Sequence, residues 1–93
     1  MLTSILLQSK KNGEISNFLS KFYNTDLKIK NDLKWEKTFQ NPIEMADFIG
    51  IYADNINSFN IKMWIKLDKD VFINISEQNA NLIIKYLFER YPY

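Results

Sequence analysis

Every second residue between Phe59 and Leu67 is apolar in this 93-residue chain, and the same alternation returns between Val71 and Ile75. A period of two is typical of strands that bury one face and leave the other open. The segment Asp68-Lys69-Asp70 separates the two runs and favours a turn. If both aliphatic rows face one side, Leu67 must pair with Val71, so we expect a hairpin with a three-residue loop.

Three further segments have the spacing of amphipathic helices. Apolar residues recur at i, i+3, i+4 and i+7 within residues 14–23. The segment Asn41-Pro42-Ile43-Glu44 combines a capping side chain, a proline at the first helical position and a glutamate three residues after the cap, so it predicts a helix start. The apolar stripe that follows it ends near Asn55 or Asn57, and Ser76 is expected to cap a third helix.

The first half of the chain adds two strands and one uncertain segment. Residues 2–8 form an apolar run of strand length, residues 33–39 alternate, and residues 26–30 are a doubtful hairpin arm. The order is therefore β-α-β-β-α-β-β-α, in which the first six elements follow the ferredoxin-like pattern and an extra strand and a C-terminal helix are added. We expect an α+β fold in one domain over residues 1–93: a two-layer sandwich with a mostly antiparallel sheet of four or five strands and three helices.

The chain contains no histidine and no cysteine, which excludes whole classes of chemistry. The usual zinc sites, Ser-His and Cys-His nucleophile pairs, haem ligation and redox dithiols all need one of these side chains. The sequence also lacks a P-loop, a dinucleotide fingerprint and a nucleophile elbow. We therefore expect no catalytic residue, no metal and no cofactor, and we do not expect an enzyme.

Composition also bears on the setting of the protein. The N-terminus has no signal-peptide pattern, and no run approaches the roughly 20 apolar residues of a membrane span. The bases are almost all lysine, and asparagine and isoleucine are abundant, as in proteins from AT-rich bacterial genomes. We expect a bacterial, cytoplasmic protein that does not associate with membranes.

The predicted open sheet face brings together Lys62, Trp64, Lys66 and Phe72. Lysines that flank aromatic rings on an open sheet are how some RNA-binding domains stack bases. Against that function, the net charge is only +1 and the glycine-and-aromatic strand signature of those domains is missing. The interpretation that we favour is packing of Trp64 and Phe72 against the last helix, a loop or a second subunit. Single-stranded nucleic-acid binding is the alternative.

A second candidate surface consists of apolar residues that point away from the main helix stripes. These candidate interface residues are Ile51, Leu82, Tyr86, Tyr91 and Tyr93. Lateral packing between helices could also account for the first three. The surplus of apolar and aromatic positions favours a small non-catalytic interaction or regulatory module, with a protein partner or a homodimer as its assembly.

The second helix also carries a stripe of small residues, Ala46, Gly50, Ala53 and Asn57. Glycine inside a helix costs about 1 kcal/mol relative to alanine, so its presence suggests the close approach of another segment. We expect that segment to be the neighbouring helix on the same sheet face, with a ligand or a partner helix as the alternative.

Overall fold

The computed structural model describes residues 3–20, 33–68 and 70–91. Residues 26–30, the doubtful hairpin arm, lie outside these ranges. The elements in chain order are β1 (Thr3–Ser9), α1 (Glu14–Ser20), β2 (Lys34–Phe39), α2 (Pro42–Tyr52), a 3₁₀ helix η1 (Ala53–Phe59), β3 (Ile61–Asp68), β4 (Val71–Ile75) and α3 (Ala80–Arg90).

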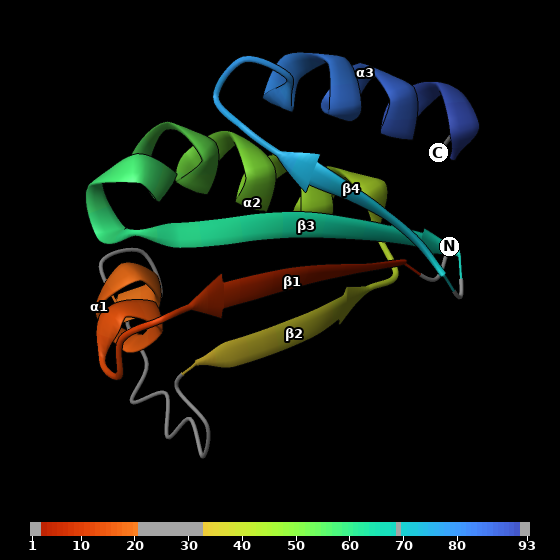
Figure 1. Ribbon diagram of the computed structural model, residues 1–93. Helices are drawn as coiled ribbons and strands as arrows, with labels where there is room; N and C mark the ends of the chain where they lie inside the picture. Colours follow the sequence, from red (N-terminus) through yellow and green to blue (C-terminus); the bar gives the residue numbers. More distant parts are fainter. Residues whose placement is uncertain (1–2, 21–32, 69, 92–93) are drawn as a thin grey trace.

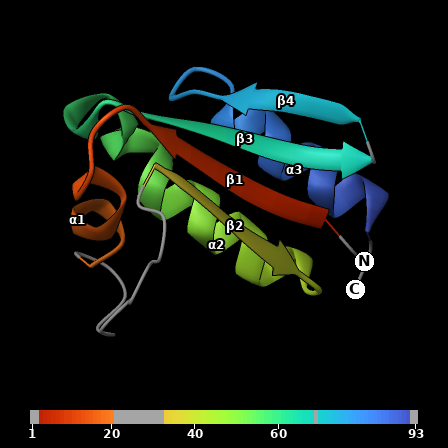
Figure 2. The same cartoon turned by 60° about the horizontal axis from the view of Figure 1, so that its bottom comes forward.

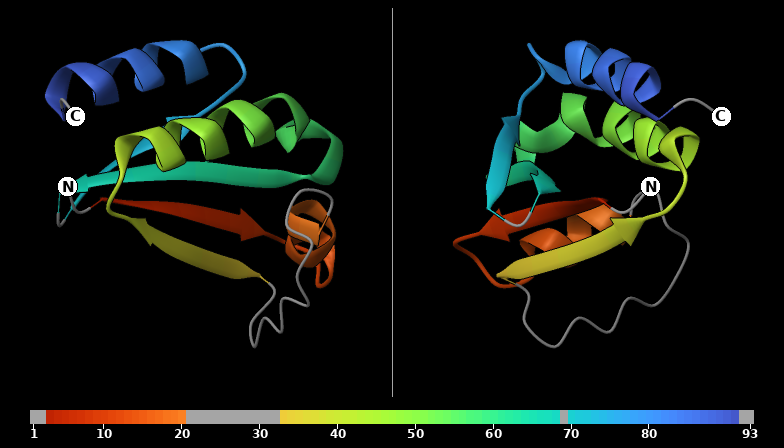
Figure 3. Two further views of the ribbon diagram at one scale, coloured as in Figure 1. Left: turned by 180° about the vertical axis from the view of Figure 1, so that it is seen from behind. Right: turned by 90° about the vertical axis from the view of Figure 1, so that its right-hand side faces the viewer.

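The four strands form an antiparallel sheet in the order β2-β1-β3-β4, and the helices lie against one of its faces (Figure 1). Helices α2 and α3 run side by side over that face, as Figures 2 and 3 show from different sides. Helix α1 closes one end of the same layer, where the ring of Phe18 lies 4.5 Å from the ring of Tyr52 in α2. This arrangement confirms the predicted α+β sandwich.

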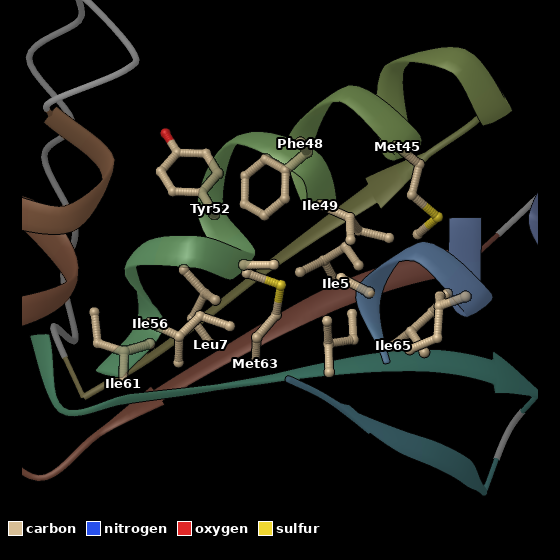
Figure 4. Close-up of a cluster of buried hydrophobic side chains, with 14 of the residues drawn as sticks. Ile5, Leu7, Met45, Phe48, Ile49, Tyr52, Ile56, Ile61, Met63 and Ile65 are labelled. Carbon is tan, nitrogen blue, oxygen red and sulfur yellow. The ribbon is translucent and has the colours of Figure 1, made fainter. Parts of the chain in front are cut away.

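The core lies between the sheet and α2, and it is built from alternate strand residues facing one helix stripe (Figure 4). Because neighbouring strand residues point to opposite faces, one row from each central strand reaches the helices. Burying a large apolar side chain stabilises the fold by about 1.5–3 kcal/mol. The central strands contribute Ile5 and Leu7 from β1 and Ile61, Met63 and Ile65 from β3, the outer strands add Phe39 and Ile75, and α2 supplies Met45, Phe48, Ile49 and Tyr52.

In the hairpin of β3 and β4 the aliphatic rows lie on the predicted side, but the loop is shorter than the three residues expected. Ile65 pairs with Ile73 and Met63 pairs with Ile75, so both rows face the helices, as expected. The prediction that Leu67 pairs with Val71 is wrong, because Asp68 takes that position and a bulge falls between residues 66 and 68. A bulge places two residues of one strand opposite one residue of the other, which leaves Leu67 as the extra residue.

The start of α2 confirms its prediction, while its end differs. The Asn41 side-chain oxygen accepts hydrogen bonds from the backbone N–H groups of Ile43 and Glu44, at 2.7 and 3.4 Å. After Tyr52 the helix tightens into η1, which ends at Asn60 in the left-handed conformation, with φ of 54°. Phe59, expected to be the first strand residue, is therefore the last residue of η1.

The start of α3 also differs from the prediction, because Ser76 caps a turn ahead of the helix. The backbone N–H of Ser76 donates to the Asn79 side chain at 2.7 Å, and the backbone N–H of Asn79 donates to the Ser76 hydroxyl at 3.3 Å. The α-helix itself begins at Ala80.

Candidate functional site

The sheet face that points away from the helices carries three rows of side chains across its strands. Register fixes these rows, since directly paired residues of antiparallel strands project to the same side. The side chains are mostly polar or charged, with one tryptophan at the centre and one phenylalanine at the β4 end. In order from β2 outward the rows are Lys34–Gln8–Lys62, Glu36–Leu6–Trp64–Asn74 and Thr38–Ser4–Lys66–Phe72. We call this surface the open face.

The four candidate binding residues all lie on the open face, as the sequence predicted. The Lys66 ammonium lies 5.8 Å from the centre of the Phe72 ring, which is 44% exposed. The half-buried indole of Trp64 donates a hydrogen bond from Nε1 to Gln8 Oε1 at 3.2 Å. Helix α3 lies against the opposite face of the sheet (Figure 3), so it does not cover Trp64 and Phe72. Packing of these rings under the last helix, one of the favoured interpretations, is therefore wrong.

A cavity of about 760 Å³ opens at one end of this face, beside the first of the three rows. The β1–α1 turn, the start of β2, the end of η1 and the start of β3 form its walls. Among the described residues, the polar side chains of its lining are lysines, amides and the Ser9 hydroxyl, without an acid, and they lie beside the apolar Leu33, Ile56 and Ile61. Among these residues are Lys10, Lys11, Lys34 and Lys62, together with Gln8, Asn57 and Asn60.

Positive charge is concentrated at this end of the molecule. Between described residues the structure shows an ion pair of Lys37 with Glu44, at 3.6 Å, and none that involves a cavity lysine. Counted over the described part of the chain, the open face and the cavity together carry five lysines and one acid, Glu36, although the whole chain has a net charge of only +1. The near-zero net charge of the whole chain therefore gave no indication of this local cationic surface.

Sequence reasoning missed Lys10, Lys11 and Gln8 as parts of this surface. A weak signal was present, because residues 1–37 carry seven lysines against four acids. What the sequence does not reveal is the pairing of β1 with β3, which places Gln8 directly beside Lys62.

The β4 edge is the second notable surface. Among the described strands, β4 pairs with β3 and forms the edge of the sheet. Its residues are exposed from Val71 to Asn74, with 46% of Val71 and 40% of Ile73 accessible. Of the eight exposed large hydrophobic side chains in the described residues, five belong to β4 and to α3, which lies beside it (Figure 3). We call these five residues, Val71, Phe72, Ile73, Leu82 and Tyr86, the apolar edge.

The structure brings two of the predicted interface residues together and separates a third. Leu82, which is 69% exposed, and Tyr86 lie one turn apart on α3. Ile51 lies on a different helix, α2, and it is two positions from the buried Ile49, so it points away from the core. Tyr93 lies outside the described residues.

Tyr91 is half-buried and packs partly against the core. Arg90 donates hydrogen bonds to the hydroxyl groups of Tyr91, at 3.3 Å, and Tyr86, at 2.8 Å. These hydrogen bonds raise the pKa of Arg90 above its ordinary value, so the guanidinium stays charged beside both rings.

The small-residue stripe of α2 does not hold a close neighbour at its glycine. Ala46 and Ala53 are buried, but a Cβ added at Gly50 would meet nothing within 4 Å. The expected close approach of the neighbouring helix at Gly50 is therefore wrong.

Within the described ranges no group of three or more His, Cys, Asp or Glu side chains could hold a metal ion. None of the helices in those ranges has the length and apolar character that a membrane crossing requires. Comparison of this chain with models of protein families, with curated proteins and with solved structures finds no match.

Proposed function

We propose that this chain is a small non-catalytic module of the bacterial cytoplasm that acts by protein contact and pairs with a second copy of itself through the β4 edge. The observation that carries the proposal is the exposure of β4, an apolar edge strand whose outward backbone groups have no strand partner among the described residues. An exposed apolar edge is a template for pairing with another strand.

A second copy fits this edge because antiparallel pairing of one strand with its own copy satisfies two-fold symmetry. In such an interface each residue contacts the same surface on the other protomer. The exposed Val71 and Ile73 share one face of β4, and Phe72 lies on the other. Pairing would therefore cover apolar side chains on both faces and also satisfy backbone N–H and C=O groups.

The strand at the other end of the described sheet shows what a protected edge looks like. There β2 places charged side chains on both of its faces, with Lys34 and Glu36 on the open face and Lys37 on the helix face. Charged side chains, lysine above all, are a common means of preventing edge-to-edge association. In β4 all five residues, Val71 to Ile75, are uncharged.

The test is the oligomeric state of Ile73→Lys measured by analytical ultracentrifugation. We expect the natural chain to sediment as a dimer at micromolar concentration and the variant as a monomer, because a lysine in the middle of β4 would be buried between two copies. The matched control is Ile51→Lys, since Ile51 is 45% exposed against 40% for Ile73 but lies on α2. This control should remain a dimer.

Two results would overturn the proposal: a natural chain that is monomeric at high micromolar concentration, or loss of the dimer in Ile51→Lys with Ile73→Lys unaffected. Circular dichroism establishes that both variants fold. If Ile73→Lys does not fold, amide hydrogen exchange on the natural chain tests whether β4 pairs with a second copy. Slow exchange of the outward β4 amides is expected in a dimer, and fast exchange would contradict it.

A further inference from the structure

We infer that the open face binds single-stranded nucleic acid, with phosphate groups in the lysine-lined cavity and a base on Trp64. The inference does not rest on the dimer, because the cavity residues come from the β1–α1 turn, β2, η1 and β3 rather than from β4. A monomeric variant should therefore bind as well as the natural chain.

The cavity supplies the phosphate-binding part of this site. Four lysines from three separate segments line it, and none of the other described lining residues is an acid that would compete for them. Cations that neutralise phosphates and release counterions provide most of the sequence-independent affinity for nucleic acids. The amide side chains of Gln8 and Asn60 add donors and acceptors at the same place.

Strand β3 continues the cavity into a path along the open face. Lys62 lines this cavity and also the neighbouring one of about 480 Å³, whose lining includes Trp64 and Asn74 and, at its β4–α3 side, the acid Glu77. Same-face residues of a strand lie about 7 Å apart, so Lys62, Trp64 and Lys66 alternate cation, aromatic ring and cation at regular steps. A single strand offers the complementary alternation of phosphates and flat bases.

Trp64 is the residue best placed to stack a base. Its hydrogen bond to Gln8 holds the indole toward the cavity end of the face, and Lys62 pairs with Gln8 in the adjoining row. Phe72 lies diagonally opposite on β4, where Lys66 already contacts its ring. An aromatic platform beside a cationic groove is the arrangement of proteins that bind single strands without sequence preference. A site for a simple anion would need the lysines but not the rings.

The experiment measures binding of a fluorescein-labelled oligouridine by fluorescence anisotropy over a series of salt concentrations. If four lysines contact phosphates, log K should fall against log salt with a slope of about −3, since each contact on a single strand contributes about −0.7. Lys62→Gln should weaken binding by about threefold to tenfold and make the slope shallower by about 0.7. Lys85→Gln, an exposed lysine on α3, is the matched control and should change neither quantity.

Trp64→Leu tests the stacking part separately. Loss of a stacked base should weaken binding by about tenfold and leave the salt slope unchanged. If this variant does not fold, the fluorescence of Trp64 in a Trp35→Phe background replaces it, and quenching by the oligonucleotide is the expected result. The ring stack of Trp35 on Phe48 is retained by phenylalanine in that background.

Inorganic tripolyphosphate and an acidic peptide serve as competitors. Absence of oligonucleotide binding at low salt would overturn the inference, as would equal losses in Lys62→Gln and Lys85→Gln. Binding of tripolyphosphate or the peptide with unchanged affinity in Trp64→Leu would assign the cavity to another anion instead. Loss of oligonucleotide binding together with the dimer in Ile73→Lys would mean that the two surfaces are not independent.

Discussion

Phe48 connects α2 to β2 through ring contacts in the core. Its ring stacks on Trp35 of β2 at 5.7 Å and meets Phe39 at 5.6 Å, both measured between ring centres. On its own helix it lies 4.4 Å from Tyr52, whose ring also meets Phe18 of α1. The helix is therefore joined to β2 and α1 through one aromatic chain, and such ring pairs contribute about 0.5–1.5 kcal/mol beyond their burial.

Truncation of Phe48 should be among the costliest single changes in this protein. We expect Phe48→Ala to lower the free energy of unfolding by about 3–5 kcal/mol, because it leaves a cavity and removes three ring contacts. Urea denaturation followed by circular dichroism measures this loss. Ile43→Ala, at an exposed position of α2 outside both proposed surfaces, should cost less than about 1 kcal/mol. Equal losses in the two variants would show that Phe48 is not central to the core.

The sequence predicts which side chains of β3 lie on the open face, but it does not predict which residues of other segments lie beside them. Alternation along β3 placed Lys62, Trp64 and Lys66 correctly because the period of two is a local property. Lys10, Lys11 and Gln8 join them through pairing between strands more than half the chain apart. No local pattern encodes that pairing, so the lysine-lined cavity was not foreseen.

The beginning and the end of α2 differ in how well the sequence encodes them. A helix start leaves N–H groups without partners, and particular side chains satisfy them, so Asn41 and Pro42 marked it clearly. The end has no such marker, because the apolar spacing continues through the buried Ile56 while the backbone tightens into η1. The reversal comes at Asn60, which adopts a left-handed conformation that asparagine tolerates better than most residues.

The capping role of Asn41 leads to a stability prediction. Asn41→Ala should lower the free energy of unfolding by about 1 kcal/mol, because the N–H groups of Ile43 and Glu44 lose their acceptor. Asn41→Ser keeps an oxygen at that position and should cost at most about half as much. Thermal and urea unfolding of the two variants provide the comparison. A serine variant no more stable than the alanine variant would contradict the capping role.

The hairpin of β3 and β4 was predicted in direction and misplaced by one residue at its tip. The row of Ile65 and Ile73 must face the helices to be buried, and that requirement fixed the register near the middle of the strands. Close to the turn, Leu67 packs partly against the core, and the bulge absorbs the extra residue. Burial therefore sets the register in the middle of the strands, which the helices cover. Turn geometry sets it near the hairpin loop.

The two proposed surfaces of the whole molecule differ in chemistry, so solution conditions should separate them. The apolar edge depends on hydrophobic burial and backbone hydrogen bonds, while the open face depends on lysines. At physiological ionic strength, salt largely screens exposed charges that lie more than about 8 Å apart, whereas it has little effect on apolar burial.

Self-association should also be visible in the thermal stability of the chain. For a dimer that dissociates as it unfolds, a tenfold rise in concentration should raise the melting midpoint by about 3–5 °C, because the folded state is the one that pairs. Differential scanning calorimetry over a concentration series measures this shift. The midpoint of Ile73→Lys should not move with concentration. A natural chain with a fixed midpoint would contradict pairing through β4.

The contrast between the charged strand β2 and the uncharged strand β4 also limits how far an assembly can grow. A sheet whose two edge strands can both pair with further copies assembles into an open-ended filament. A sheet with one such edge strand stops at a dimer. In the proposed dimer, Lys34, Glu36 and Lys37 keep the β2 edge from accepting a further copy. These charges would allow β4 to remain apolar without the hazard of fibre formation.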